Sequence, residues 1–243
     1  MRNFLALTRR ELGVYFVSPT AYVILTAMLA LSAYVFLASL EMAAGNRLPV
    51  DFSMTLSSIS FIVVVSAGLV TMRLIAEEKS RGTLEIALTA PVTETQFVLG
   101  KFAATLVLLL WQLAVTGGFV LIISRYGKID LGAILCGYVG VLLVGAAVYA
   151  IGIFISSLCV SQVTAGMITF VVGLMLLAVQ IAYESPKMQG AWFLPLLRAF
   201  ALTEHMNDFM RGVVDTGRLV TLAAVTGWFL FLTVRVVESR RWR

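Results

Sequence analysis

The sequence predicts an all-α integral membrane protein with six transmembrane helices. Of its 243 residues, 60% are hydrophobic and only 13% are charged, and the mean hydropathy is +0.97. A soluble domain is usually about 45–50% apolar and about one quarter charged. No soluble core of this size could bury that much apolar surface, so lipid must solvate much of it. We expect a single transmembrane domain over residues 1–243.

Six stretches are apolar enough to cross a bilayer as helices, each of which needs about 20 residues. None of them contains Asp, Glu, Lys, Arg or His. The first has a longer apolar run and a longer polar lead than a signal peptide, so we expect it to be retained as a helix. The stretches are Thr20–Leu40, Ser53–Met72, Phe102–Ser124, Leu131–Leu158, Val163–Tyr183 and Leu219–Val234.

Basic residues predict the orientation of these spans. An even number of spans places both termini on one side of the membrane, and that side also carries the loop between the second and third spans. It holds 11 of the 18 Lys and Arg residues, so the positive-inside rule predicts that both termini are cytoplasmic. The same asymmetry accounts for the net charge of +5 without a nucleic-acid partner.

The N-terminal segment, residues 1–19, is predicted to form a helix on the cytoplasmic membrane surface. Its apolar side chains share one face with Thr8, and its arginines lie outside that face, which is typical of an interfacial amphipathic helix. The Ser18–Pro19 pair then separates it from the first span. A basic flank that only sets the topology is the alternative. The face comprises Phe4, Leu5, Leu12, Tyr15 and Phe16, and the arginines are Arg2, Arg9 and Arg10.

The cytoplasmic loop 73–101 is predicted to contain a short helix of its own. Charged residues from Arg73 to Arg81 indicate that the second span continues as a helix into the cytoplasm, and Gly82 can end it. Thr83 can cap a short amphipathic helix that Pro91 closes, and Thr93 can cap the third span. Such a helix needs lipid or a soluble partner against its apolar face, which is formed by Leu84, Ala87 and Leu88.

A first run of residues in this loop is Glu77-Glu78-Lys79-Ser80-Arg81-Gly82-Thr83-Leu84-Glu85, with Leu88-Thr89-Ala90-Pro91-Val92 and Val98-Leu99-Gly100-Lys101. It resembles the signature of a known family, the ABC-2 type permeases, which are six-span membrane subunits of ATP-binding-cassette transporters. A second run, residues 202–215, is similar to the external segment of the gliding-motility-type branch. It departs from that branch in having Leu-Thr-Glu and Met206 in place of a Ser-Pro-like start and aromatic residues around His205.

The resemblance implies that the short loop helix is a coupling helix seated on a separate ATPase subunit, with the N-terminal helix beside it. ATP and Mg²⁺ would be bound by that partner, with no cofactor in this chain. A second permease copy or a related permease, and membrane lipid, are the other implied partners, in a bacterial inner membrane. The implied coupling residues are Glu77, Glu78, Arg81, Gly82, Thr83, Leu84, Glu85, Leu88 and Pro91, with Arg9, Arg10 and Leu12 on the interfacial helix.

The chain itself is not expected to hydrolyse ATP or to be an enzyme. A phosphate-binding loop around Gly100-Lys101 would need Gly and Ser or Thr where Thr95 and Phe102 stand. His205, beside Glu204 and Asp208, is weak support for a metal site or a general base, so we expect neither catalytic residues nor a metal. The external segment, residues 184–218, is expected to form short helices before the last span.

Other functions remain open on the sequence alone. A secondary carrier usually places an ionisable residue inside the membrane, and the six spans contain none. Their strongest polar groups, Gln112 and Gln180, are expected to make hydrogen bonds between helices. A membrane scaffold that transports nothing, and a channel or secondary carrier, are therefore kept as alternatives to the transporter permease.

Overall fold

The computed structural model describes residues 2–46, 52–83, 93–125, 130–184, 201, 206 and 208–240. Throughout these ranges the backbone forms helices joined by turns, which confirms the predicted all-α class. The helices are α1 (Arg2–Val17), α2 (Pro19–Asn46), α3 (Phe52–Thr71), α4 (Ala76–Ser80), α6 (Glu94–Ile123), α7 (Leu131–Leu158), α8 (Gln162–Glu184) and α11 (Thr216–Arg240).

Six of these helices are long and apolar enough to cross a membrane, as predicted. The fourth predicted span coincides with α7. The third is longer than expected, because α6 begins eight residues earlier, at Glu94, where Thr93 forms a capping box with Gln96. The cap at Thr93 is thus confirmed. The added N-terminal turns of α6 include Lys101, which directly precedes the apolar stretch from which the span was predicted.

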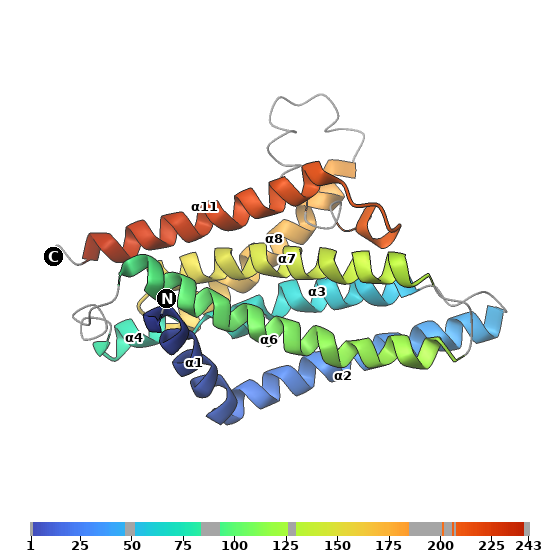
Figure 1. Cartoon of the computed structure of the whole chain (residues 1–243), viewed down its shortest axis with the longest axis horizontal. Coiled ribbons are helices and arrows are strands. Elements are labelled where there is room, and N and C mark those ends of the chain that lie inside the picture. The colour runs from blue at the N-terminus through green and yellow to red at the C-terminus, as the bar shows by residue number, and fades with distance from the viewer. Residues whose placement is uncertain are drawn as a thin grey trace.

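The six long helices run along the longest axis of the molecule (Figure 1). Of these, α3 and α7 are the most deeply buried, and their buried residues Ile59, Val63, Val144 and Val148 belong to the main apolar cluster. The other spans leave large apolar side chains exposed on their outer faces, as expected where lipid is the solvent. The chain is therefore a multi-pass membrane protein built around α3 and α7.

Small residues allow the central helices to approach closely. A Cβ added to Gly152 of α7 would lie 2.3 Å from the Thr71 hydroxyl of α3, and one added to Gly68 would lie 2.6 Å from the carbonyl oxygen of Gly166 in α8. Any larger side chain would force these helices apart. The last turn of α3 is therefore held in place by both α7 and α8.

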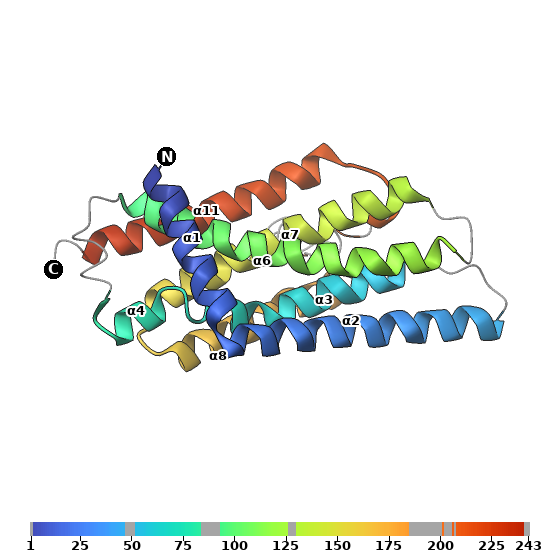
Figure 2. The ribbon, with the colours of Figure 1, turned by 60° about the horizontal axis from the view of Figure 1, so that its bottom comes forward.

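Helices α1 and α4 lie at the same end of the bundle as the C-terminal end of α11 (Figure 1). There α1 crosses the long helices at a steep angle and packs on α6 (Figure 2). The helix ends before Ser18, as predicted, and the Tyr15 hydroxyl donates a hydrogen bond of 2.7 Å to the carbonyl oxygen of Val70. This bond joins the end of α1 to the end of α3.

Part of the predicted apolar face of α1 packs against the bundle, and the rest is exposed, as expected where an interfacial helix meets lipid. Tyr15 is buried and Leu12 is half-buried, but Leu5 and Phe16 are exposed. The side of α1 that meets α6 is instead centred on a strip that includes the buried polar residues Thr8 and Glu11. Glu11 can face the protein because the buried ammonium group of Lys101, on α6, neutralises its carboxylate. The pattern of apolar residues along the N-terminal helix does not reveal this pairing.

The second span continues as helix to Ser80, close to the predicted end at Gly82, but a turn interrupts it. The helix α3 ends at Thr71, a turn follows, and α4 starts afresh at Ala76. The Ser156 hydroxyl of α7 accepts hydrogen bonds from the N–H groups of Ile75 and Ala76, at 3.2 and 3.1 Å. It also donates one of 3.3 Å to the carbonyl oxygen of Met72. A side chain inserted into the backbone ladder in this way interrupts a helix.

Two predicted elements lie outside the described residues, wholly or largely. The short coupling helix falls on residues 84–92, and most of the external segment 184–218 is also outside, including His205. In the described part of that segment, Met206 and Phe209 are buried against α7 near Gly140, and Asp208 pairs with Arg218 at 2.6 Å.

Candidate functional site

A buried lysine joins three helices at the end of the bundle where α1 and α4 lie. The Lys101 ammonium of α6 lies 3.1 Å from Oε1 of Glu11 in α1 and 3.0 Å from Oε1 of Glu78 in α4. Its side chain is only 2% exposed, and the Phe97 ring lies beneath the ammonium at 4.9 Å. Desolvating one cation between two carboxylates is costly unless all three stay together, so the three helices are coupled at this point.

Arg10 pairs with the same two carboxylates, those of Glu11 and Glu78, from the solvent side. Its Nη2 lies 2.8 Å from Oε1 of Glu78 and 3.2 Å from Oε1 of Glu11. Because its side chain is 54% exposed, the arginine adds less free energy than the buried lysine. We call Arg10, Glu11, Glu78 and Lys101 the lysine cluster. It neutralises two carboxylates that would otherwise be buried as unpaired charges.

A second group of charges surrounds Glu77 on the neighbouring face of α4. Arg73 and Arg81 lie 3.2 and 2.7 Å from its carboxylate oxygens, and Gln162 at the start of α8 donates a hydrogen bond of 2.8 Å. Arg73 also donates to the Ser18 hydroxyl at 2.9 Å, which reaches the break between α1 and α2. Glu77 therefore links α4 to α8 and, through Arg73, to the N-terminal helix.

The last turn of α7 holds α4 from a third direction. In addition to Ser156, which receives the first N–H groups of α4, the ammonium of Lys79 donates to the carbonyl oxygen of Ser157. Since α4 has only five residues, it would not be stable by itself. Its position is set by side chains of α1, α6, α7 and α8.

The chain leaves α4 through a glycine in the left-handed region. Gly82 has φ of +69°, and its N–H donates to the carbonyl oxygen of Lys79. Only glycine adopts this conformation at low cost, so the predicted stop at Gly82 is confirmed. The Thr83 hydroxyl donates back to the Glu78 carbonyl oxygen at 3.3 Å. The backbone direction at Gly82 and Thr83 is thus fixed by α4.

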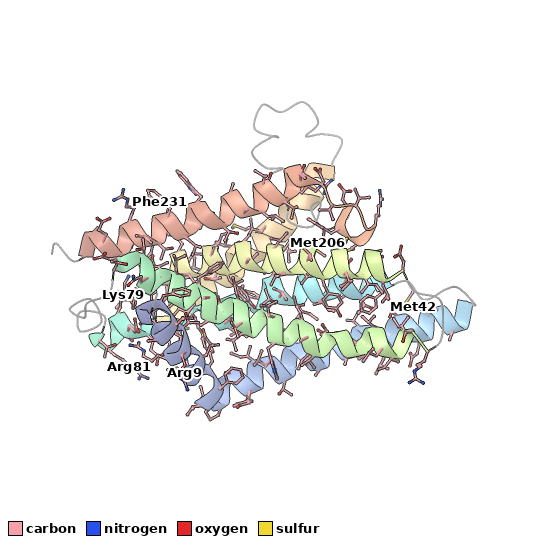
Figure 3. The ribbon with its side chains drawn as sticks, viewed as in Figure 1. Arg9, Met42, Lys79, Arg81, Met206 and Phe231 are labelled. Atoms are coloured by element: carbon pink, nitrogen blue, oxygen red, sulfur yellow. The ribbon has the colours of Figure 1, made fainter. Side chains whose placement is uncertain are left out.

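A cavity of about 330 Å³ lies between α1 and α4, and both groups of charges border it. Tyr15 forms part of its wall, where burial raises the pKa of the phenol above its usual value and the nearby Glu11 carboxylate raises it further. The phenol therefore keeps its proton and continues to donate to Val70. Arg9, Lys79 and Arg81 lie at this end of the molecule (Figure 3).

The site brings together six of the eight described residues that the resemblance implied, and several that it did not. Glu77, Glu78, Arg81, Gly82, Thr83 and Arg10 lie together, whereas Arg9 is exposed on the outer side of α1 and Leu12 is half-buried beside the cluster. Leu84, Glu85, Leu88 and Pro91 lie outside the described residues. The residues missed as site members are Glu11, Arg73, Lys101, Ser156 and Gln162.

The arrangement consists of charged side chains that pair between neighbouring helices. The described residues contain no group of three or more His, Cys, Asp or Glu side chains that could hold a metal ion. The charges are paired with each other across helix boundaries. What the geometry provides is a set of polar contacts that connect α4 to four other helices, α1, α6, α7 and α8.

Comparison with known proteins identifies the same family as the sequence resemblance. A family model described as "ABC-2 family transporter protein" matches residues 14–237. The chain is also similar to the "Probable multidrug ABC transporter permease YbhR" of Escherichia coli (strain K12) and to the protein of that name in Escherichia coli O157:H7. It is 29% identical to each over 159 residues, which is 65% of this chain. The alignment spans 42% of the length of these relatives.

Proposed function

This chain belongs to the ABC-2 family of transporter proteins, and from that premise we propose that it is the membrane-spanning permease subunit of an ATP-binding-cassette transporter. A separate ATPase subunit binds ATP and Mg²⁺ and supplies the energy, so the chain itself is not an enzyme. Two permease copies, or this chain and a related permease, pair with two ATPase subunits.

The observation that carries this proposal is the way α4 is held. The five residues of α4, which are separated from the 84–92 segment by three residues, are bound by ion pairs to α1 and α6 and by hydrogen bonds to α7 and α8. A push on residues 84–92 from a cytoplasmic subunit would therefore move several helices together. In this proposal residues 84–92 contact the ATPase subunit, with Leu84, Glu85, Leu88 and Pro91 at the contact, and Arg9 and Arg10 lie beside it.

The orientation follows from the same proposal. The end of the bundle with α1, α4 and the end of α11 faces the cytoplasm of a bacterial inner membrane, in agreement with the excess of basic residues there. The two cysteines test this, because Cys136 lies near the start of α7 and Cys159 directly after its end. A membrane-impermeant maleimide should label Cys159 in inside-out vesicles and not in intact spheroplasts. The reverse result would invert the orientation.

Within the family we assign the chain to the gliding-motility-type branch, supported by the sequence of residues 202–215. Most of that run lies outside the described residues, so the support is that of the sequence alone. A tree of permease sequences that groups the chain with multidrug permeases would contradict the assignment. Because the relatives above are named as multidrug permeases, sensitivity to drugs in a deletion strain is the first test of cargo.

The decisive experiment is purification of the tagged chain from its native membrane, with the partner proteins identified and their ATP hydrolysis measured. We expect a nucleotide-binding subunit to copurify. The double variant Glu78→Ala, Gly82→Pro should lose it by about tenfold or more, because proline cannot adopt the positive φ of Gly82. The control Arg235→Ala removes an exposed ion pair with Glu238 on α11 and should retain it.

The contrary outcomes separate the alternatives. If no nucleotide-binding subunit is recovered with the wild-type chain, a scaffold or a secondary carrier accounts for the protein better than a transporter permease does. If the subunit is recovered equally with the double variant, the permease function stands and the coupling site lies elsewhere. Gel filtration of each variant establishes that the loss does not arise from unfolding.

A further inference from the structure

A buried amide lacks a hydrogen-bond partner inside the bundle. Gln112 of α6 is 1% exposed, and its Nε2 makes no hydrogen bond within the described part of the chain. The expected hydrogen bond from this amide nitrogen to another helix is therefore not made. Water cannot solvate such a group from the lipid side, so an unpaired amide at this depth requires an explanation.

Gln112 borders a small, partly open cavity of about 20 Å³ where five helices meet, which we call the void. One water molecule needs roughly 10–15 Å³, so the void has room for one but not for a larger solute. The two tyrosines in its wall are Tyr15 of α1 and Tyr149 of α7, and the remaining lining is mainly aliphatic. Both tyrosines are buried, at 8% and 1% exposure. A purely apolar void would stay dry, whereas this one contains an amide and two phenols.

We propose that this void is a binding site for a single water molecule, which Gln112 and the two tyrosines hold. The water accepts a hydrogen bond from the Gln112 amide nitrogen and donates to phenolic oxygens. Tyr15 can accept because its own hydrogen is used on the carbonyl oxygen of Val70. Exchanging the oxygen and nitrogen of the Gln112 amide would not alter the proposal, because water can donate or accept.

The site would have a consequence for the N-terminal helix. Tyr15 lies in the wall of both this void and the cytoplasmic cavity between α1 and α4, so it separates the bound water from that cavity. A bound water can re-form its hydrogen bonds when its neighbours shift slightly, which a direct bond between side chains does less readily. The end of α1 could then move against α6 while the amide of Gln112 stays paired.

Radiolytic hydroxyl-radical footprinting of the intact chain in detergent tests the proposal, because bound water generates radicals beside buried side chains. We expect Tyr149 to be modified at least about tenfold more than Phe36, which is buried to 2% in the same apolar core but does not border the void. Modification of Tyr149 at the level of Phe36 in the wild-type chain would overturn the proposal, and this comparison requires no variant.

A variant pair identifies the amide as the group that holds the water. Gln112→Met preserves the size of the side chain and should lower Tyr149 modification to the level of Phe36. The control Leu109→Met changes a neighbouring residue of α6 that is 1% exposed and does not border the void, and it should leave Tyr149 modification unchanged. If Gln112→Met leaves the modification unchanged, Gln112 does not hold the water and the assigned site is wrong.

Discussion

The ammonium group of Lys101 lies 3.0 Å from a carboxylate oxygen of Glu78, and this ion pair joins the start of α6 to the short helix α4. The lysine is almost completely buried, and Glu11 of α1 lies at 3.1 Å on its other side. A buried charge placed in this way between two helices can hold both of them in a single arrangement against α6. The strength of that connection can be measured.

Replacing Lys101 by methionine should destabilise the protein by about 3 kcal/mol, because Glu11 and Glu78 lose their buried cation. The value is at the lower end for a buried pair, since Arg10 still reaches both carboxylates. Thermal unfolding in detergent compares the stability of the Lys101→Met variant with that of the wild-type chain. The exposed Arg235–Glu238 pair is the control, and Arg235→Met should cost less than about 1 kcal/mol.

Neutralising the carboxylates tests the cause of that loss. If unpaired charge is responsible, Glu11→Gln and Glu78→Gln added to Lys101→Met should recover most of the stability. A triple variant that is as unstable as Lys101→Met alone would instead mean that the lysine contributes through packing, including its contact with Phe97.

Replacing Ser156 by alanine should loosen α4 without unfolding the bundle. The N–H groups of Ile75 and Ala76 lose their acceptor, which typically costs about 0.5–2 kcal/mol at a helix N-terminus. Hydrogen exchange of residues 75–80 should become faster by tenfold or so, while the centre of α7 is unchanged. Ser157→Ala is the matched control, because the Ser157 hydroxyl bonds only within α7, to Phe154. Equal exchange in the two variants would contradict a capping role for Ser156.

The six spans could be predicted from the sequence because lipid imposes a simple pattern. About 20 apolar residues without charge suffice to identify a crossing helix, and α7 was predicted at both ends. The helix caps could be predicted as well, because Thr93 and Gly82 start and end helices through backbone groups only a few residues away. These features depend on neighbouring residues in the chain.

The lysine cluster and the break after α3 could not be predicted in this way. Glu11 and Lys101 are 90 residues apart, and Ser156 is about 80 residues from the backbone that it caps. No local pattern marks such partners. One signal was available: Glu11 is an acidic residue close to the buried face of the N-terminal helix, and an acid in that position requires a buried cation or donor.

Replacing Gly100 by valine should force α1 away from α6. A Cβ at Gly100 would lie 3.1 Å from the Leu7 Cβ, so a branched side chain cannot fit without movement of the N-terminal helix. We expect a loss of about 1–3 kcal/mol, as for other overpacked contacts. Gly117 on the same helix has open space around it, and Gly117→Val should lose less than about 1 kcal/mol. Similar unfolding temperatures for the two variants would argue against this contact.

Replacing Gly82 by alanine should cost about 1–2 kcal/mol, because an L side chain at φ of +69° clashes with its own backbone. The strain arises where the chain leaves α4, so the substitution should also redirect the segment that we propose contacts the ATPase subunit.

Replacing Gly13 by alanine is a control for which the change in stability should have the opposite sign. Gly13 lies within α1 with nothing near its Cβ position, so Gly13→Ala should stabilise the protein by about 0.5–1 kcal/mol. The two variants are compared by thermal unfolding and by recovery of the ATPase subunit. Reduced recovery with Gly82→Ala alone is expected, because only that substitution changes the path of the chain beyond α4. If Gly13→Ala reduces recovery as much, the exit angle at Gly82 is not what positions the contact.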